Sequence, residues 1–330
     1  MKKFKKFDII NARKKENFMS KRLLSPALLL LAAILWGFAF AAQESASQIP
    51  AFTLGAIRSI LGGAFLTAVI IILDKVLKTN RRLISRKGID FNRYELIGGA
   101  ICGTVLATAS AFQQLGINGE TDGGKAAFIT ALYVVLVPIY ALVLKRRAPL
   151  NVWLAVGVSV VGFYLLCIKD DFSIARSDLL VLAASLIFPI HILTIDRFAP
   201  KCDGVRMSCV QFFTAAIINT AVALIFERPI DIVAIKDAAL PIAYLGIASS
   251  GIAYTLQIMG QRGANPAAAS ILLSLESVFG VIGTAVVFGT VLEVREYVGC
   301  AIVLFAVILA ELDVKGIINH INQIKNNSRT

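Results

Sequence analysis

Apolar residues run along almost the whole chain in segments of about 20 residues, which short polar stretches separate. A helix needs about 20 mainly apolar residues to cross a hydrocarbon layer ~30 Å thick, so each segment predicts one transmembrane helix. The ten predicted spans are residues 25–46, 50–73, 94–117, 124–144, 151–168, 178–197, 207–226, 239–259, 266–289 and 296–314. Runs such as 27–40 never alternate polar and apolar residues, which excludes β-barrel strands. The pattern predicts an all-α polytopic membrane protein.

Composition excludes the other broad classes of protein. Hydrophobic residues make up 57% of the 330 residues and charged residues 16%, whereas soluble domains carry about 25% charged residues. A soluble core of this size could not bury so much apolar surface, and a disordered chain would not contain it. Because the apolar runs fill the sequence, a protein with a single membrane anchor is excluded as well.

Basic residues predict the orientation in the membrane. With the N-terminus in the cytoplasm, the inside segments hold 26 of the 33 lysines and arginines, a strong positive-inside bias. We therefore expect a multi-pass protein of the plasma (inner) membrane with both termini cytoplasmic, a basic arm at 1–24 and a tail at 315–330. Translation could begin at Met1 or at Met19. Topology and lipid contact explain the net charge of +12 without a nucleic-acid partner.

The two halves of the chain resemble each other. Residues 32–38 resemble residues 184–190, and residues 153–166 resemble residues 297–310 in spacing and glycine placement. We therefore predict two five-helix repeats, at 25–168 and 178–314. A unit with an odd number of spans inserts in opposite orientations when it is duplicated in tandem. Such inverted repeats are typical of secondary transporters, whose substrate site lies near the midplane between the repeats.

Several motifs resemble one known family over residues 25–314. They are Trp36-Gly37 in span one, Arg58 in span two, residues 124–138 in span four, residues 275–279 in span nine and residues 295–299 at the start of span ten. Together these are similar to EamA-type members of the drug/metabolite transporter superfamily, although Ser277 stands where that family often has proline. The resemblance implies ten helices, cytoplasmic termini and transport of small metabolites such as amino acids, nucleotide sugars or toxic cations.

Polar groups inside the spans are candidates for the substrate site, because such groups are costly in lipid and should face the bundle interior. The predicted cavity residues are Trp36, Gln113, Gln114, Tyr133, His191, Tyr254, Gln257 and Glu276. The amides can bind polar substrate groups, the aromatic rings can form walls, and Glu276 or His191 could carry protons. Structural hydrogen bonds, ordinary packing and transport without proton coupling are the alternatives.

Four further residues are candidates for moving parts. Glu44 and Arg58 lie at similar depth near the outer ends of spans one and two, where they could form a gate or a structural ion pair. Pro138 and Pro189 are candidate hinges or kinks, because a proline ring removes a helical hydrogen bond.

The sequence thus predicts a secondary transporter, a permease or exporter that moves small polar metabolites such as amino acids by alternating access. Its partners would be a small-molecule substrate and membrane lipid, with proton coupling and a homodimer through spans five and ten left open. A lipid-modifying enzyme using His191 and Asp196 is an alternative, but five residues on a helix turn about 500°, which separates these side chains. A non-transporting scaffold is another. No catalytic residue, cofactor or metal site is expected, because the corresponding motifs are missing from the sequence.

Overall fold

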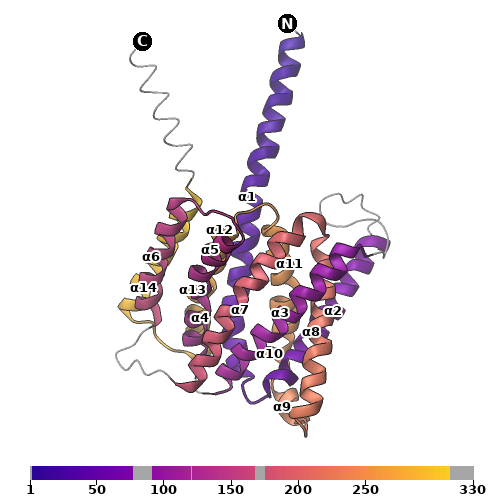
Figure 1. The fold of residues 1–330 in the computed structure, drawn as a ribbon, viewed down its shortest axis with the longest axis vertical. Coiled ribbons are helices and arrows are strands. Elements are labelled where there is room, and N and C mark those ends of the chain that lie inside the picture. Colours follow the sequence, from indigo (N-terminus) through magenta and orange to yellow (C-terminus); the bar gives the residue numbers. More distant parts are fainter. Residues whose placement is uncertain (1, 77–90, 120, 168–174, 313–330) are drawn as a thin grey trace.

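The computed structural model describes residues 2–76, 91–119, 121–167 and 175–312, which fold into a bundle of helices (Figure 1). The elements are α1 (Lys2–Ser45), α2 (Ala51–Ile71), η1 (Ile72–Val76), α3 (Arg93–Ile117), α4 (Gly123–Ala131), α5 (Tyr133–Val143), α6 (Leu150–Cys167), α7 (Arg176–Phe198), η2 (Ala199–Lys201), α8 (Gly204–Phe226), α9 (Ile232–Asp237), α10 (Ala239–Ala243), η3 (Tyr244–Ala253), α11 (Tyr254–Gly260), α12 (Pro266–Leu273), α13 (Glu276–Phe288) and α14 (Val294–Glu311). The all-α fold class is confirmed. The predicted tail at 315–330 lies outside the described residues.

Eight helical segments in the described ranges are long and apolar enough to cross a membrane. They are Leu24–Ser45, Ala51–Asp74, Arg93–Ile117, Gly123–Val143, Arg176–Lys201, Gly204–Phe226, Ala239–Gly260 and Pro266–Phe288. The predicted spans five and ten correspond to α6 and α14, which have 18 residues each. Large apolar side chains face outward, as with Ile217, which is 71% exposed, and Ile308, which is 61% exposed. This exterior suits lipid, and the count of ten spans stays a prediction.

Polar residues in the connections fix where several helices begin. Asn92 and Glu95 form a capping box at the start of α3, in which each side chain accepts a hydrogen bond from the other residue's backbone N–H. The Asp122 side chain accepts a backbone N–H at the start of α4, and the Asp203 side chain accepts two at the start of α8. Asn265 caps α12, whose first residue is a proline. These caps satisfy N–H groups that a helix start leaves without partners.

Three membrane-spanning segments are irregular in the middle. The segment Gly123–Val143 is interrupted at Leu132, between α4 and α5, and Pro266–Phe288 is interrupted at residues 274–275, between α12 and α13. The segment Ala239–Gly260 contains the π-helix η3. These interruptions do not coincide with Pro138 or Pro189, because α5 continues through Pro138 and α7 through Pro189. A hinge or kink at either proline stays a prediction. Prolines are tolerated within transmembrane helices when neighbouring groups satisfy the freed carbonyl, so a proline alone does not locate a break.

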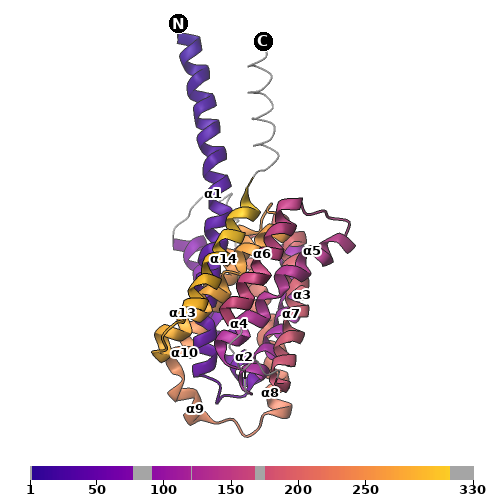
Figure 2. The ribbon, with the colours of Figure 1, turned by 90° about the vertical axis from the view of Figure 1, so that its left-hand side faces the viewer.

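The packing places α1 against α11, η3 and α13, while α3 packs against α7 and α8. Helices α6 and α14 pack on each other at one edge of the bundle (Figure 1). We call the end of the bundle from which α1 projects the arm end, and the opposite end, where α9 lies, the far end (Figure 2).

A buried ion pair joins two helices near the arm end. The Nη2 atom of Arg206, at the start of α8, lies 2.5 Å from a carboxylate oxygen of Asp74 in η1, and the Arg206 side chain is fully buried. Its guanidinium also lies over the ring of Phe91, 5.4 Å from the ring centre. Burial raises the pKa of the neighbouring Asp203, although backbone hydrogen bonds from Arg206 and Val205 oppose that shift. The pair fixes the end of α2 to α8.

Candidate functional site

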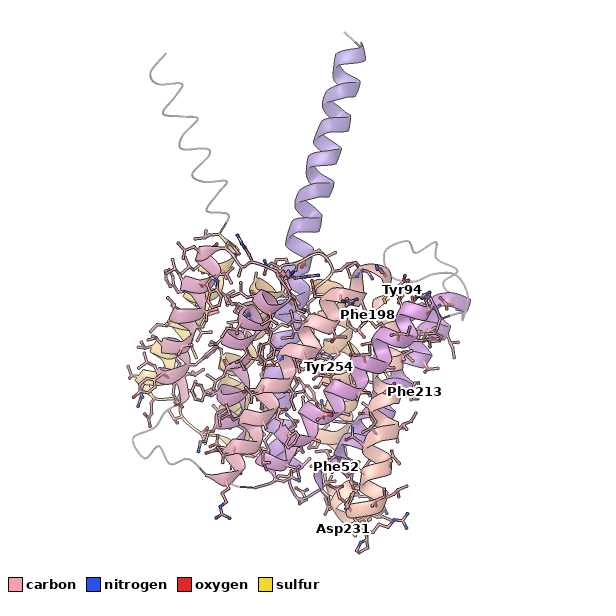
Figure 3. The ribbon with its side chains drawn as sticks, in the orientation of Figure 1. Phe52, Tyr94, Phe198, Phe213, Asp231 and Tyr254 are labelled. Carbon is pink, nitrogen blue, oxygen red and sulfur yellow. The ribbon has the colours of Figure 1, made fainter. Side chains whose placement is uncertain are left out.

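A cavity lies inside the bundle, and the space between its lining atoms amounts to about 490 Å³ when the part open to solvent is included. It is lined by Trp36, Ala39, Phe40, Gln43, Arg58, Gln113, Thr130, Tyr133, Phe188, Ile192, Ser249, Tyr254, Gln257, Leu273 and Glu276. Tyr254 lies between Tyr94 and Phe198 towards the arm end and Phe52 and Asp231 at the far end (Figure 3). The cavity therefore lies near the middle of the bundle, and segments from both halves of the chain contribute to its wall.

Aromatic rings form one wall of the cavity. The rings of Trp36 and Tyr254 lie 4.6 Å apart at an angle of 57°, and Phe212 meets Tyr254 edge-on at 5.4 Å. The indole N–H of Trp36 donates to the carbonyl oxygen of Ser249, 3.3 Å away in η3. This contact holds α1 against the π-helix and fixes the orientation of the indole ring.

Polar side chains from the irregular segments complete the cavity. The amide nitrogen of Gln113 donates to the hydroxyl of Thr130 at 2.9 Å. The Oε1 atom of Gln257 is buried, and no hydrogen-bond partner for it lies in the described part of the chain. Tyr133 and Glu276 each come directly after a helix interruption, and the tyrosine hydroxyl lies beside the carboxyl group. The wall can therefore offer both donors and acceptors to a polar molecule.

Arg58 lines the cavity but does not pair with Glu44, so the predicted ion pair is wrong. Its guanidinium donates to the hydroxyls of Ser250 at 3.3 Å and Ser249 at 3.5 Å, and to the Gln43 amide oxygen at 3.4 Å. Glu44 instead accepts the backbone N–H of Gly123 at 2.9 Å. Adjacent residues point about 100° apart on a helix, so when Gln43 faces Arg58 the next side chain faces α4.

His191 and Gln114 lie outside the lining of the central cavity. The His191 ring lies edge-on to Tyr254 at 5.7 Å, and its Nε2 atom is 3.1 Å from the amide oxygen of Gln211. Gln114 donates to Asn118 at 2.7 Å and lines a smaller cavity next to Arg58. Six of the eight predicted cavity residues thus surround one space, and these two support its wall from behind.

Polar contacts tie the segments together at the far end. Lys125 in α4 forms a 2.6 Å ion pair with Asp178 in α7, which also accepts the Thr121 hydroxyl at 2.8 Å. Together with the contact between Glu44 and Gly123, these bonds hold the start of α4 to α1 and α7.

A second set of contacts lies at the arm end. Arg262 donates to the carbonyl oxygens of Ala199, at 3.1 Å, and Cys202. Ser25 in α1 donates to the carbonyl oxygen of Gly260. Helices from the two halves are therefore tied together on both sides of the cavity.

The geometry does not favour the lipid-modifying enzyme. Asp196 pairs with Arg146, and His191 contacts Gln211, so the two candidate catalytic residues are engaged with different partners. The described residues contain no group of three or more histidine, cysteine or acidic residues that could hold a metal ion.

Several lining residues were not singled out from the sequence. Gln43, Thr130 and Ser249 supply polar groups, and Phe188 adds an aromatic ring. Gln43 is the polar neighbour of Glu44, and Ser249 belongs to a Ser-Ser-Gly run inside an apolar segment. The sequence could have indicated both residues, because polar or small residues within a span mark the faces that point into the bundle.

Comparison with known proteins identifies the family. The EamA-like transporter family matches residues 24–168 and again residues 175–312. A curated protein of Archaeoglobus fulgidus, described as an uncharacterized transporter, is 27% identical over 300 residues, which cover 89% of this chain and 88% of that protein. One protein of known crystal structure shares the fold, with a TM-score of 0.69 at 17% identity over 87% of this chain and 96% of its own. The chain belongs to the EamA-like transporter family of the drug/metabolite transporter superfamily and is a multi-pass membrane transporter.

Proposed function

We propose that this protein is a secondary transporter that moves small polar metabolites, such as amino acids or related compounds, by alternating access. One observation carries the proposal: a cavity with polar and aromatic walls lies midway through an apolar bundle, beside two interrupted helices. Interrupted helices near the midplane are a recurring feature of transporter substrate sites. Polar groups are costly in lipid, so their convergence on one space favours a substrate path over a scaffold.

The packing of the helices supports two inverted repeats. If α7 to α14 repeat the order of α1 to α6, then the contact of α3 with α7 corresponds to that of α1 with α11 and η3. The contact of α3 with α8 likewise corresponds to that of α2 with η3, and the contact of α1 with α13 to those of α7 with α4 and α5. Contacts of α2 with α8 and of α6 with α14 correspond to themselves. This is the pattern that a twofold axis through the cavity would produce.

The basic residues support an arm end that faces the cytoplasm in the plasma membrane. Most lysines and arginines fall in segments that the repeat model places at that end. The contacts at the far end, through Lys125 and Asp178, would then close the external mouth. Those at the arm end, through Arg262 and Ser25, would close the cytoplasmic mouth. Alternating access requires each set to break in turn.

Uptake by vesicles tests the proposed function. Purified protein reconstituted in liposomes should accumulate at least one labelled solute from a panel of amino acids, nucleosides, sugars and organic cations. Protein-free liposomes provide the background. If a competent reconstituted protein moves no member of the panel above that background, the proposal fails.

Glu276 is the proposed proton carrier, because it lines the cavity and His191 does not. We expect an imposed pH gradient to accelerate uptake several-fold in the wild type, and Glu276→Gln to remove this acceleration because the amide cannot exchange a proton. His191→Gln is the matched control and should keep the wild-type response. The measurement is the ratio of initial uptake rates with and without the gradient. Coupling through Glu276 is refuted if Glu276→Gln keeps that ratio.

A further inference from the structure

Arg58 is a buried cation that lacks an acidic partner. Its side chain is 8% exposed, and the described part of the chain places no carboxylate within ion-pair distance of its guanidinium. The three oxygen atoms to which it donates belong to neutral groups and lie 3.3–3.5 Å away. Hydrogen bonds between a charged nitrogen and a carboxylate are usually 2.7–2.9 Å long. Because a guanidinium does not give up its proton in proteins, this charge persists inside the bundle.

Three other basic side chains form ion pairs with aspartates: Lys125 with Asp178, Arg146 with Asp196, and Arg206 with Asp74. Arg206 is the other buried arginine in the described residues. A buried charge without a counter-charge is costly, and an opposite charge that arrives offsets part of that cost. Of the two buried arginines in the described residues, the one without an aspartate partner is Arg58, which lines the candidate substrate cavity. This contrast points to a ligand that carries the missing negative charge.

We propose that Arg58 is the anion-binding residue of the cavity, and that the transported compounds carry a carboxylate group. This inference rests on the proposed function and specifies its substrate class. The planar fork of guanidinium N–H groups matches the two oxygens of a carboxylate. A single cation among neutral partners balances one negative charge, which favours a carboxylate over a phosphate dianion. The Ser249 and Ser250 hydroxyls lie next to the Arg58 guanidinium and can rotate to donate hydrogen bonds to the anion.

The guanidinium borders two cavities. Arg58 lines the central cavity and also the smaller one, where Ser110, Gln114 and Asn219 are its polar neighbours. In the central cavity, the acceptor oxygen of Gln257 suits a substrate N–H or O–H group. The expected substrate is therefore a small carboxylic acid that also carries a hydrogen-bond donor.

The test uses a tryptophan that already lies in the cavity. The sequence has two tryptophans, so Trp153→Phe leaves Trp36 as the only one. Acetate and its neutral isostere acetamide are titrated into this single-tryptophan protein, and the bulky buffer anion MES keeps the ionic strength constant. Trp36 emission and the thermal unfolding midpoint are recorded, and inorganic phosphate forms a third arm. We expect acetate to bind at least about tenfold more tightly than acetamide, a difference of about 1.4 kcal/mol, and more tightly than phosphate.

Substitution of Arg58 decides whether this preference comes from the guanidinium. Arg58→Gln should abolish the preference for acetate over acetamide, and Arg58→Lys should retain part of it. Glutamine is a suitable replacement, because Gln211 holds the corresponding position in the second half of the sequence. Circular dichroism verifies that each variant is folded. The inference is overturned if the Arg58 protein binds acetate and acetamide equally. It is also overturned if neither compound changes the emission or the unfolding midpoint up to about 100 mM, a concentration at which weak ligands still raise stability. A folded Arg58→Gln protein that keeps the preference for acetate overturns it as well. A preference for phosphate overturns the choice of carboxylate.

The proposed anion site and the proposed transport function can be refuted independently of each other. If acetate binding depends on Arg58 but the vesicles transport nothing, the anion site stands and the transporter proposal falls. If the vesicles transport a solute but binding is indifferent to Arg58, the transporter proposal stands and the anion site falls.

Discussion

Asp74→Asn should destabilise the bundle by about 3–5 kcal/mol, the range for removing one partner of a buried ion pair. The substitution removes the carboxylate that lies 2.5 Å from the fully buried guanidinium of Arg206. The double variant Asp74→Asn, Arg206→Met should recover much of the loss, because it removes the buried positive charge as well. Titration with SDS, followed by circular dichroism, measures the free energy of unfolding.

The pair between Arg146 and Asp196 provides the control, since the Arg146 side chain is 50% exposed. Water already screens that charge, so Asp196→Asn, which leaves only the exposed arginine behind, should cost less than about 1 kcal/mol. An Asp74→Asn protein as stable as the Asp196→Asn protein would show that the buried pair does not hold α2 to α8.

Gly37→Val should prevent α1 from packing against α13. A Cβ atom at Gly37 would lie 2.2 Å from the Cβ atom of Phe279 and 2.6 Å from its carbonyl carbon, and the backbone of α13 cannot move away without displacing the helix. Overpacking of this kind costs typically 1–3 kcal/mol, and it would also displace the neighbouring Trp36 from the cavity wall. We expect a lower thermal unfolding midpoint and a lower yield of folded protein.

Gly157→Val is the matched control, because no atom outside the glycine's own stretch of α6 lies within 4 Å of its Cβ position. It makes the same chemical change in an apolar helix of the bundle without a collision. Equal midpoints for the two variants would contradict the close contact of α1 with α13.

The spans could be predicted from the sequence because lipid imposes a simple requirement on each. Long apolar runs specify helices, and polar residues such as Asn92 and Asp203 mark where helices start. The interruptions could not be located in this way. Leu132 is an ordinary helix former, whereas Pro138 looks like a breaker, and only the packing of neighbouring helices shows that the chain deviates at the leucine.

Part of the candidate site was also predictable. Polar residues within spans converge on one cavity, as the cost of burying them in lipid requires. Which of two adjacent residues faces that cavity depends on helix rotation, which a sequence without strong periodicity does not fix. Gln113 therefore lines the central cavity and Gln114 does not, and Gln43 rather than Glu44 meets Arg58. The π-helix η3, which brings Ser249 to the site, leaves no periodic signal in its sequence.

The most direct test of alternating access is the labelling of a single cysteine in the cavity from each side of the membrane. Ala39 lines the cavity and is 3% exposed, so Ala39→Cys in a variant whose five native cysteines are replaced provides the reporter. A membrane-impermeant thiol reagent is applied to vesicles of either orientation, with and without a transported solute. We predict labelling from both sides and protection by the solute. Labelling from one side only, in vesicles that transport, would contradict the account.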